Sequence, residues 1–159
     1  MVPGRTRGVA LFVRNASGLI LILREWGTKP HLGKFAGMYS IPMETSQPGE
    51  SDPVALQRLV REELPGLEDQ VGINPGRVGL YRIVPRVWVS LYAAAMNSSN
   101  LPVRKTDEVG DYAWIEPEYV FTRWLRQGAR EMIADALSDA QGVVQRSCVT
   151  PLSPPITVP

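Results

Sequence analysis

The sequence contains little of the chemistry that many enzyme classes require. There is one cysteine, Cys148, and one histidine, His31, among 159 residues. A single cysteine excludes an intramolecular disulfide and a cluster of thiolate metal ligands, and a single histidine leaves almost no material for a multi-histidine zinc site or a histidine-dependent triad. We interpret His31 as a loop residue. The scarcity of cysteine is typical of a reducing compartment, and we expect the protein in the cytoplasm.

The sequence also lacks a dominant charge and long apolar runs. Lys and Arg total 17 against 16 Asp and Glu, which gives a formal net charge of +1. The chain therefore has no overall positive field to attract a nucleic acid polymer or an anionic membrane. No apolar run is long enough to span a bilayer, and the N-terminal residues lack the pattern of a signal peptide. We expect neither partner, and any anion must be bound locally.

What is present is an ordinary globular composition. The sequence is 44% hydrophobic and 21% charged, which predicts one compact domain with a real core. We assign residues 1–146 to this domain. Residues 147–159 are dominated by Pro, Ser, Thr and Val, and they predict a flexible C-terminal tail rather than regular structure.

Local patterns predict several strands joined by polar loops. Aliphatic runs at residues 8–13 and 19–23 flank turn residues and indicate a β-hairpin. Further extended segments are predicted at residues 38–41, 78–84, 87–95 and 112–115. Loops are predicted at residues 27–37 and 44–50. The sheet should therefore be mixed, with mostly non-local pairing.

Two helices are predicted from capping residues and helical spacing. The first lies between Ser51, which together with the following Asp suits a helix cap, and Pro65, which stops the helix. The second begins near Glu116 and ends near Leu137, with a break near Gly128.

The chemistry is concentrated in the first of these helices. Its last two turns carry Arg58 and the adjacent carboxylates Glu62 and Glu63. Such a carboxylate pair can hold a hard cation such as Mg²⁺, which neutralises a diphosphate and activates water. The plainer interpretation is that Glu62 pairs with Arg58 at i, i+4 and that Glu63 faces solvent. The two residues alone do not decide between these interpretations.

A wider pattern around this helix resembles the Nudix box, written G-x5-E-x7-R-E-U-x-E-E-x-G-U with U apolar. Aligned without a gap from residue 44 to residue 66, Glu50 matches the first Glu and Arg58 matches the Arg. Val60 matches the apolar position, and Glu62 and Glu63 match the paired carboxylates. The resemblance as a whole extends from about residue 8 to residue 137.

The box is degenerate at three positions. Glu44 stands at the opening Gly, Leu59 replaces the Glu after the Arg, and Pro65 stands at the final Gly. In active relatives the missing Glu commonly ligates metal or assists the water, and a leucine can do neither. We hypothesise that Glu44, in the loop approaching the helix, or Glu108, where relatives often carry an auxiliary acid, supplies the lost carboxylate.

The resemblance implies an α/β (α+β) fold with a Nudix-like mixed β-sheet sandwiched between helices. It implies a hydrolase that cleaves a nucleoside diphosphate linked to another moiety by metal-assisted attack of water, with Mg²⁺ or Mn²⁺ as cofactor and a small diphosphate or nucleotide derivative as substrate. One alternative is a catalytically inactive Nudix domain that binds a nucleotide-like ligand or a protein partner. Another is an unrelated α/β scaffold. Leu59 is the residue that separates the first two.

The resemblance also implies roles for individual residues. The expected catalytic residues are Glu62, Glu63 and Glu108. The expected metal ligands are Glu62, Glu63 and Glu44. Glu50 and Arg58 should form an ion pair that fixes the loop on the helix. The candidates for substrate binding are Arg24, Lys34 and Tyr39. Arg24 would contact phosphate and Tyr39 would stack on a base; the plainer interpretations are a surface residue at the sheet edge for Arg24 and a solvated loop residue for Lys34.

Overall fold

The computed structural model describes residues 5–98, 109–138 and 144–149, which form a large mixed sheet with helices on both faces. The strands are β1 (Thr6–Arg14), β2 (Ile20–Glu25), β3 (Tyr39–Ser40), β4 (Met43–Thr45), β5 (Val71–Ile73), β6 (Gly79–Val84), β7 (Val87–Met96), β8 (Val109–Ile115) and β9 (Val144–Ser147). The helices are α1 (Asp52–Glu63), α2 (Pro117–Val120) and α3 (Ala129–Leu137), with 3₁₀ turns η1 (Pro30–Leu32) and η2 (Glu68–Gln70).

The first two strands meet at the predicted turn and then diverge. Arg14 pairs with Ile20, and the Asn15 Oδ1 atom accepts hydrogen bonds from the backbone N–H groups of Ser17 (3.0 Å) and Leu19 (2.9 Å). Beyond the turn, β4 pairs antiparallel with the start of β1, and β7 pairs parallel with β1 along its whole length. The hairpin is confirmed at its turn, and the separation of its strands makes room for β4.

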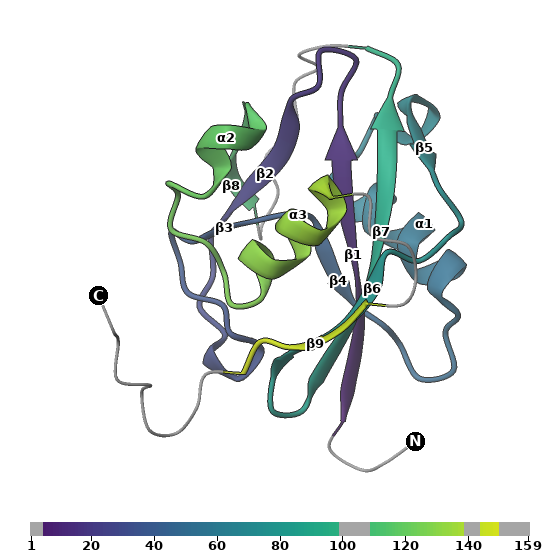
Figure 1. Cartoon of the computed structure of the whole chain (residues 1–159). Coiled ribbons are helices and arrows are strands. Elements are labelled where there is room, and N and C mark those ends of the chain that lie inside the picture. The colour runs from purple at the N-terminus through teal and green to yellow at the C-terminus, as the bar shows by residue number, and fades with distance from the viewer. Residues whose placement is uncertain (1–4, 99–108, 139–143, 150–159) are drawn as a thin grey trace.

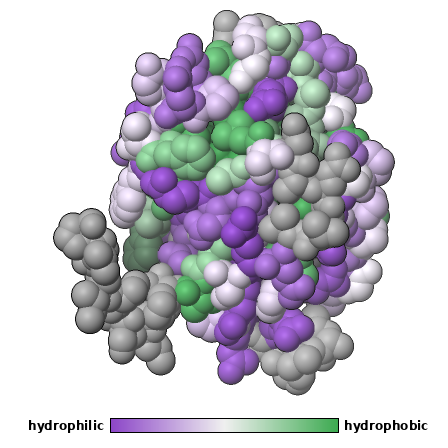
Figure 2. Space-filling view, in the orientation of Figure 1, coloured by the Kyte–Doolittle hydropathy of each residue, from purple (hydrophilic) through white to green (hydrophobic). Residues whose placement is uncertain are grey.

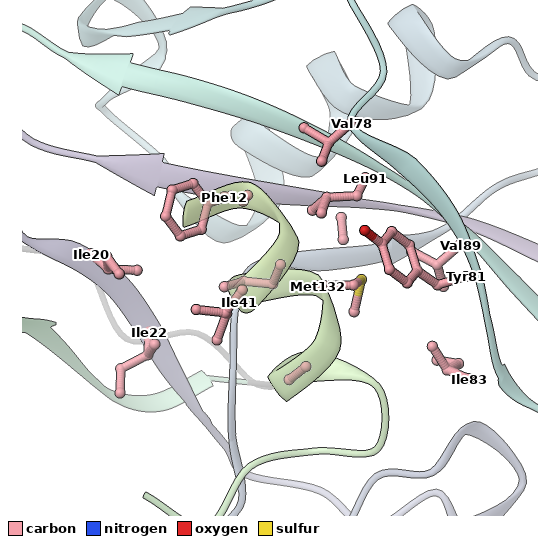
Figure 3. Close-up of a cluster of buried hydrophobic side chains, with 14 of the residues drawn as sticks. Phe12, Ile20, Ile22, Ile41, Val78, Tyr81, Ile83, Val89, Leu91 and Met132 are labelled. Atoms are coloured by element: carbon pink, nitrogen blue, oxygen red, sulfur yellow. The ribbon is translucent and has the colours of Figure 1, made fainter. Parts of the chain in front are cut away.

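Each face of the sheet has its own hydrophobic cluster, and each cluster is closed by one helix. Alternate β1 residues point to opposite faces: Ala10 and Phe12 pack with Met132 of α3, whereas Val9 and Leu11 pack with Leu59 of α1. Figure 1 shows α3 in front of the sheet and α1 behind it, and Figure 3 shows Met132 facing side chains from several strands. The predicted mixed sheet between helices is confirmed.

The outer side of α3 is solvated. Arg130 and Ala134 are exposed on it, while Met132, Ile133 and Ala136 are buried against the sheet. Figure 2 shows this side of the molecule, with hydrophilic side chains across the middle of the face. The helix therefore has one apolar stripe, as its spacing in the sequence predicts.

The closing segment is two helices rather than one. The chain leaves helical geometry after α2 and re-enters it at Ala129, and Gly128, which has φ 85°, forms the N-cap of α3. A break near Gly128 is therefore confirmed, and the interruption begins already at Phe121. Trp124, in this interruption, is 58% exposed, so its helical spacing in the sequence does not reflect a place in the core.

Two polar segments contain more regular structure than the sequence predicts. Glu44 and Thr45 lie in β4, where they pair with Val9 and Gly8 of β1, so the prediction of a loop from residue 44 was wrong there. The predicted loop at residues 27–37 also contains the 3₁₀ turn η1. The sequence pattern missed β4 because it has three residues with only one apolar side chain, too short for an alternating pattern.

The end of the described chain packs against the sheet. β9 pairs parallel with β6, and Cys148 is buried, with its N–H donating to the Arg82 carbonyl (2.7 Å). Ser147 and Cys148 fall in the segment predicted as a flexible tail, and residues 150–159 lie outside the described part. Within that part, no helix is both long and apolar enough to cross a membrane.

Gly128→Ala should destabilise the fold by about 2–3 kcal/mol. An alanine there would hold a left-handed backbone conformation, which costs about 1 kcal/mol or more, and its Cβ would overlap the Ile83 side chain. Gly18→Ala is the matched control, because Gly18 has φ 80° but no neighbouring atom within 4 Å of the place that a Cβ would occupy. Urea unfolding of both variants measures the difference. Equal losses would show that the contact with Ile83 contributes nothing.

Candidate active site at the end of helix α1

Arg58 joins the end of α1 to the segment before the helix. Its Nε atom donates to Glu50 Oε2 (3.1 Å), and its Nη2 atom donates to Glu50 Oε1 (2.8 Å) and to the Thr45 carbonyl (2.7 Å). Its Nη1 atom lies 3.1 Å from Glu44 Oε1 and 3.6 Å from Glu62 Oε2. One guanidinium thus contacts three carboxylates, so the cluster carries excess negative charge.

The pair of Glu50 with Arg58 has the geometry of a structural clamp. Both carboxylate oxygens are engaged by the guanidinium, and Glu50 Oε1 also accepts the Gln47 N–H (2.9 Å). These charge-assisted hydrogen bonds stabilise the ionised carboxylate and lower the pKa of Glu50 to about 2. The side chains of Glu50 and Arg58 therefore lie together as the sequence suggests.

Glu44 and Glu62 form the chemically unusual part of the cluster. Burial, followed by a hydrogen bond and charge repulsion from Glu62, raises the pKa of Glu44 to about 7, despite the opposing effect of Arg58. Two carboxyl groups in contact favour holding a proton between them, because both cannot ionise without cost. Glu62 is about half exposed, so solvent reaches this pair.

Leu59 and Glu63 lie on the inner side of the same helix. Leu59 is fully buried among Val9, Leu11 and other apolar residues of the α1 face, and Glu63 is only 8% exposed. The expectation that Glu63 faces solvent, which was the plainer interpretation of this residue, is wrong. A carboxylate at position 59 would enter this apolar cluster, so the motif position is occupied by a packing residue.

The carboxylates present fit a cation that needs few protein ligands. Among the described residues, no three Asp, Glu, His or Cys side chains gather as a ready metal site. Mg²⁺, however, commonly takes one or two protein carboxylates and completes its shell with water and substrate phosphate. Glu44 and Glu62, whose carboxylates lie 3.1 Å and 3.6 Å from the same Arg58 Nη1 atom, fit that requirement. Glu108, the third expected acid, lies outside the described residues.

A cavity of about 70 Å³ beside Glu44 is lined by cations. Lys34 and Arg126 both line it, and both contact the buried Glu25: the Lys34 Nζ atom lies 3.0 Å from Oε2, and the Arg126 Nη1 atom lies 3.4 Å from Oε1. Glu25 thus lies between two buried cations at the lining of this cavity. Lys34 is 5% exposed, and its interpretation as a solvated loop residue is wrong.

Arg24 and Tyr39 lie together but apart from this cavity. They are cross-strand partners in β2 and β3, and neither is among the described residues that line the cavity. Arg24 is exposed, and Tyr39 is half-buried with the Arg123 guanidinium 5.7 Å from its ring centroid. The structure therefore brings Glu44, Glu50, Arg58 and Glu62 together, places Lys34 across the cavity, and leaves Arg24 and Tyr39 on the neighbouring strands.

Sequence reasoning missed Glu25 and Arg126. Glu25 ends an apolar strand, and Arg126 lies in the interruption between α2 and α3, 101 residues away. Neither residue belongs to a motif. The signal in the sequence is a carboxylate two residues after the run Ile20–Leu23, at the end of the strand. Such a residue needs a partner if it is buried, but the pattern does not say which.

The stability of the metal-free protein should depend on Glu44 between pH 4.5 and pH 7. The folded state keeps the Glu44 proton up to about pH 7, whereas a carboxyl group with its ordinary pKa of 4.5 releases it earlier. The free energy of unfolding should therefore fall by roughly 2 kcal/mol as pH rises through this window, and Glu44→Gln should remove the fall. Glu50 acts oppositely and at lower pH, because its stabilisation is lost as pH drops from 4.5 towards 2.

Denaturant unfolding in EDTA at a series of pH values measures this dependence. Glu68→Gln is the control, because Glu68 is an exposed carboxylate in η2. If the Glu44→Gln variant kept the slope of the parent protein between pH 4.5 and pH 7, the shared proton between Glu44 and Glu62 would be excluded.

Comparisons with known proteins identify the family and the fold. The NUDIX domain family matches residues 4–136. A comparison with curated proteins found no match. Among solved structures, the MutT protein of Methanosarcina mazei Go1 is 19% identical, with a TM-score of 0.66 over 87% of this chain and 99% of that one. An ADP-ribose pyrophosphatase of Streptococcus suis is 14% identical, with a TM-score of 0.61 over 89% and 96% of the two chains.

A third similar structure is the NUDIX domain of Shewanella oneidensis NrtR, complexed with ADP ribose. It is 13% identical, with a TM-score of 0.62 over 85% of this chain and 88% of that one. At such identities these likenesses show the fold alone. The family match covers most of the chain, including the whole degenerate box. The chain is therefore a member of the Nudix family.

Proposed function

We propose that this protein is a Nudix hydrolase that cleaves a nucleoside diphosphate linked to another moiety. The observation that carries the proposal is the Glu44–Glu62 pair, which puts a second carboxylate at the end of α1 although Leu59 has removed one from the motif. The cationic cavity beside Glu44 supports a phosphorylated substrate. The structurally similar protein of Streptococcus suis is an ADP-ribose pyrophosphatase, and ADP-ribose is a nucleoside diphosphate linked to another moiety.

The residues of the cluster around Arg58 would bind the metal ion or position its ligands. Glu44 and Glu62 would hold Mg²⁺ or Mn²⁺, with Glu63 and Glu108 as further candidate acids. When bound, the metal would supply positive charge to the diphosphate and lower the pKa of attacking water. Arg58 holds Glu44 and Glu62 at the helix end and is itself fixed by Glu50.

The remaining tasks concern the substrate. Lys34, aided by Arg126, would attract phosphate oxygens, because the side chains of both cations line the cavity. Arg24 and Tyr39 would contact the substrate part that extends along β2 and β3, where Arg24 is exposed and can present its guanidinium to an oxyanion.

The alternative is a Nudix domain that binds a nucleotide-like ligand or a protein without hydrolysing anything. Two observations favour it: Leu59 is packed into the core, and the described residues hold no ready three-ligand metal site. The similar NrtR domain was crystallised with ADP ribose. The two functions differ in whether divalent metal produces phosphate-containing products.

Glu44→Gln and Glu62→Gln should each reduce metal-dependent hydrolysis by at least about a hundredfold. Either change removes a charged ligand from a site with few protein ligands, and a loss of about 2.7 kcal/mol in the transition state corresponds to that factor. Mg²⁺ and Mn²⁺ are titrated while product release from a panel of nucleoside diphosphate derivatives is assayed. Glu68→Gln, an exposed carboxylate in η2, should keep full activity.

The same assay separates the hydrolase from the binding domain. Calorimetry measures whether the wild-type protein binds members of the panel. Binding without product release in the presence of either metal would identify the protein as a binding domain. Activity that survives both glutamine substitutions would remove Glu44 and Glu62 from the metal site and would contradict the proposed compensation.

Leu59→Glu should fail to raise activity and should destabilise the protein by about 3 kcal/mol or more. The side chain is fully buried among apolar residues, so the substitution places an ionisable group where it has no water. Leu59→Met is the control, because it keeps the volume and should cost less than about 1.5 kcal/mol. Thermal unfolding and the hydrolysis assay are run together. A stable and more active Leu59→Glu variant would show that position 59 opens into the site.

A further inference from the structure

The sheet has a second polar surface, away from the cluster around Arg58. On the α1 side of the sheet, Arg7 of β1, Trp88 of β7 and Arg82 of β6 are register partners across three adjacent strands. They share a face, because Tyr81, Ile83, Val87 and Val89, the chain neighbours of Arg82 and Trp88, belong to the cluster on the α3 face. The α1 cluster includes no residue of β6. Figure 1 shows the lower ends of β1, β6 and β7 extending below α1.

This part of the sheet is hollowed and strongly basic. The hollow has a volume of about 350 Å³, and the charged residues that line it are Arg5, Arg7, Arg77 and Asp52. Asp52 accepts a hydrogen bond from the Tyr92 hydroxyl (2.7 Å) and lies 3.6 Å from Arg7, so its charge is already engaged. Three arginines against one partnered carboxylate leave a local excess of positive charge in a chain whose net charge is only +1.

The hollow also presents an aromatic surface. Trp88 is half-buried, and the Arg5 guanidinium lies over its ring, 5.8 Å from the ring centroid. The ring face is therefore accessible to a planar group. A base stacked on the same face would take the place of the Arg5 guanidinium, which would then be available to a phosphate. Arg77 is exposed at the rim.

We propose that this hollow is a second ligand site that binds a nucleotide, with its base on Trp88 and its phosphates on Arg5 and Arg77. A volume of about 350 Å³ is within the usual range of small-ligand sites and larger than a phosphate ion needs. Arginine is suited to phosphate because its planar fork donates two hydrogen bonds, and an aromatic side chain stacks on any base. Trp88, Arg5 and Arg77 belong neither to the cluster around Arg58 nor to the lining of the cavity beside Glu44, whereas Arg7 lines both the cavity and this hollow.

The test is a titration of the ¹⁵N-labelled full chain with ADP in EDTA, followed by NMR. The four tryptophans each give an indole N–H signal, and Trp88→Phe identifies the signal of Trp88. ADP should shift that signal, and Arg77→Glu should weaken the affinity at least about tenfold. Arg130→Glu is the control with the same charge change, because Arg130 is exposed on α3, across the sheet. It should leave the affinity unchanged.

Titrations with other ligands distinguish what occupies the hollow. Inorganic pyrophosphate should bind more weakly than ADP, because it has no base to stack. Equal affinity of the two, or a Trp88 signal that ADP does not move, overturns the proposal. A signal moved by a short oligothymidylate but not by ADP overturns it in favour of a nucleic acid strand. Glu62→Gln should keep ADP binding here, so the loss of hydrolysis and the loss of this site are distinguishable.

Discussion

The guanidinium of Arg58 is the constraint on which the rest of the site depends. Its three nitrogens reach Glu50, Glu44, Glu62 and a backbone carbonyl of β4, so a single side chain sets the position of α1 against the strand before it. Without the cation, three carboxylates would repel one another at the same helix end. Lysine could not replace it, because an ammonium group has no planar fork for two-point binding.

In the proposed function, the clamp lets a carboxylate from another element stand in for the one absent at position 59. Leu59 is on the inner side of α1, where its side chain packs in the apolar cluster between the helix and the sheet. Glu44 instead projects from β4, which pairs with β1, and it reaches the same helix end through Arg58 and Glu62. In the proposed function, the strand would thus supply the oxygen ligand that Leu59 cannot, while Leu59 keeps its place in the apolar cluster.

The sequence predicted the elements better than their relations. The resemblance to the Nudix box predicted the pairing of Glu50 with Arg58, and the i, i+4 spacing on one helix predicted the contact of Arg58 with Glu62. Glu44 was expected in a loop, since three residues of β4 are too few to show alternation. The contact of Lys34 and Arg126 with Glu25 depends on segments far apart in sequence. No local pattern encodes such a meeting, which only the tertiary fold produces.

Net charge is a poor guide to this molecule, because its charges are segregated. A net charge of +1 means that the whole chain creates little electrostatic field at long range. Within about a Debye length of the surface, however, the local arrangement of charges decides which ions are attracted. Closer in, acids surround Arg58 at one place, while arginines surround Trp88 at another. An acidic cluster concentrates cations, and a basic hollow concentrates anions, whatever the sum of the two. In the two proposals, these opposite local charges would let the same chain attract a divalent metal at one site and a phosphorylated ligand at another, since the excess charge at each site acts most strongly on the groups nearest to it.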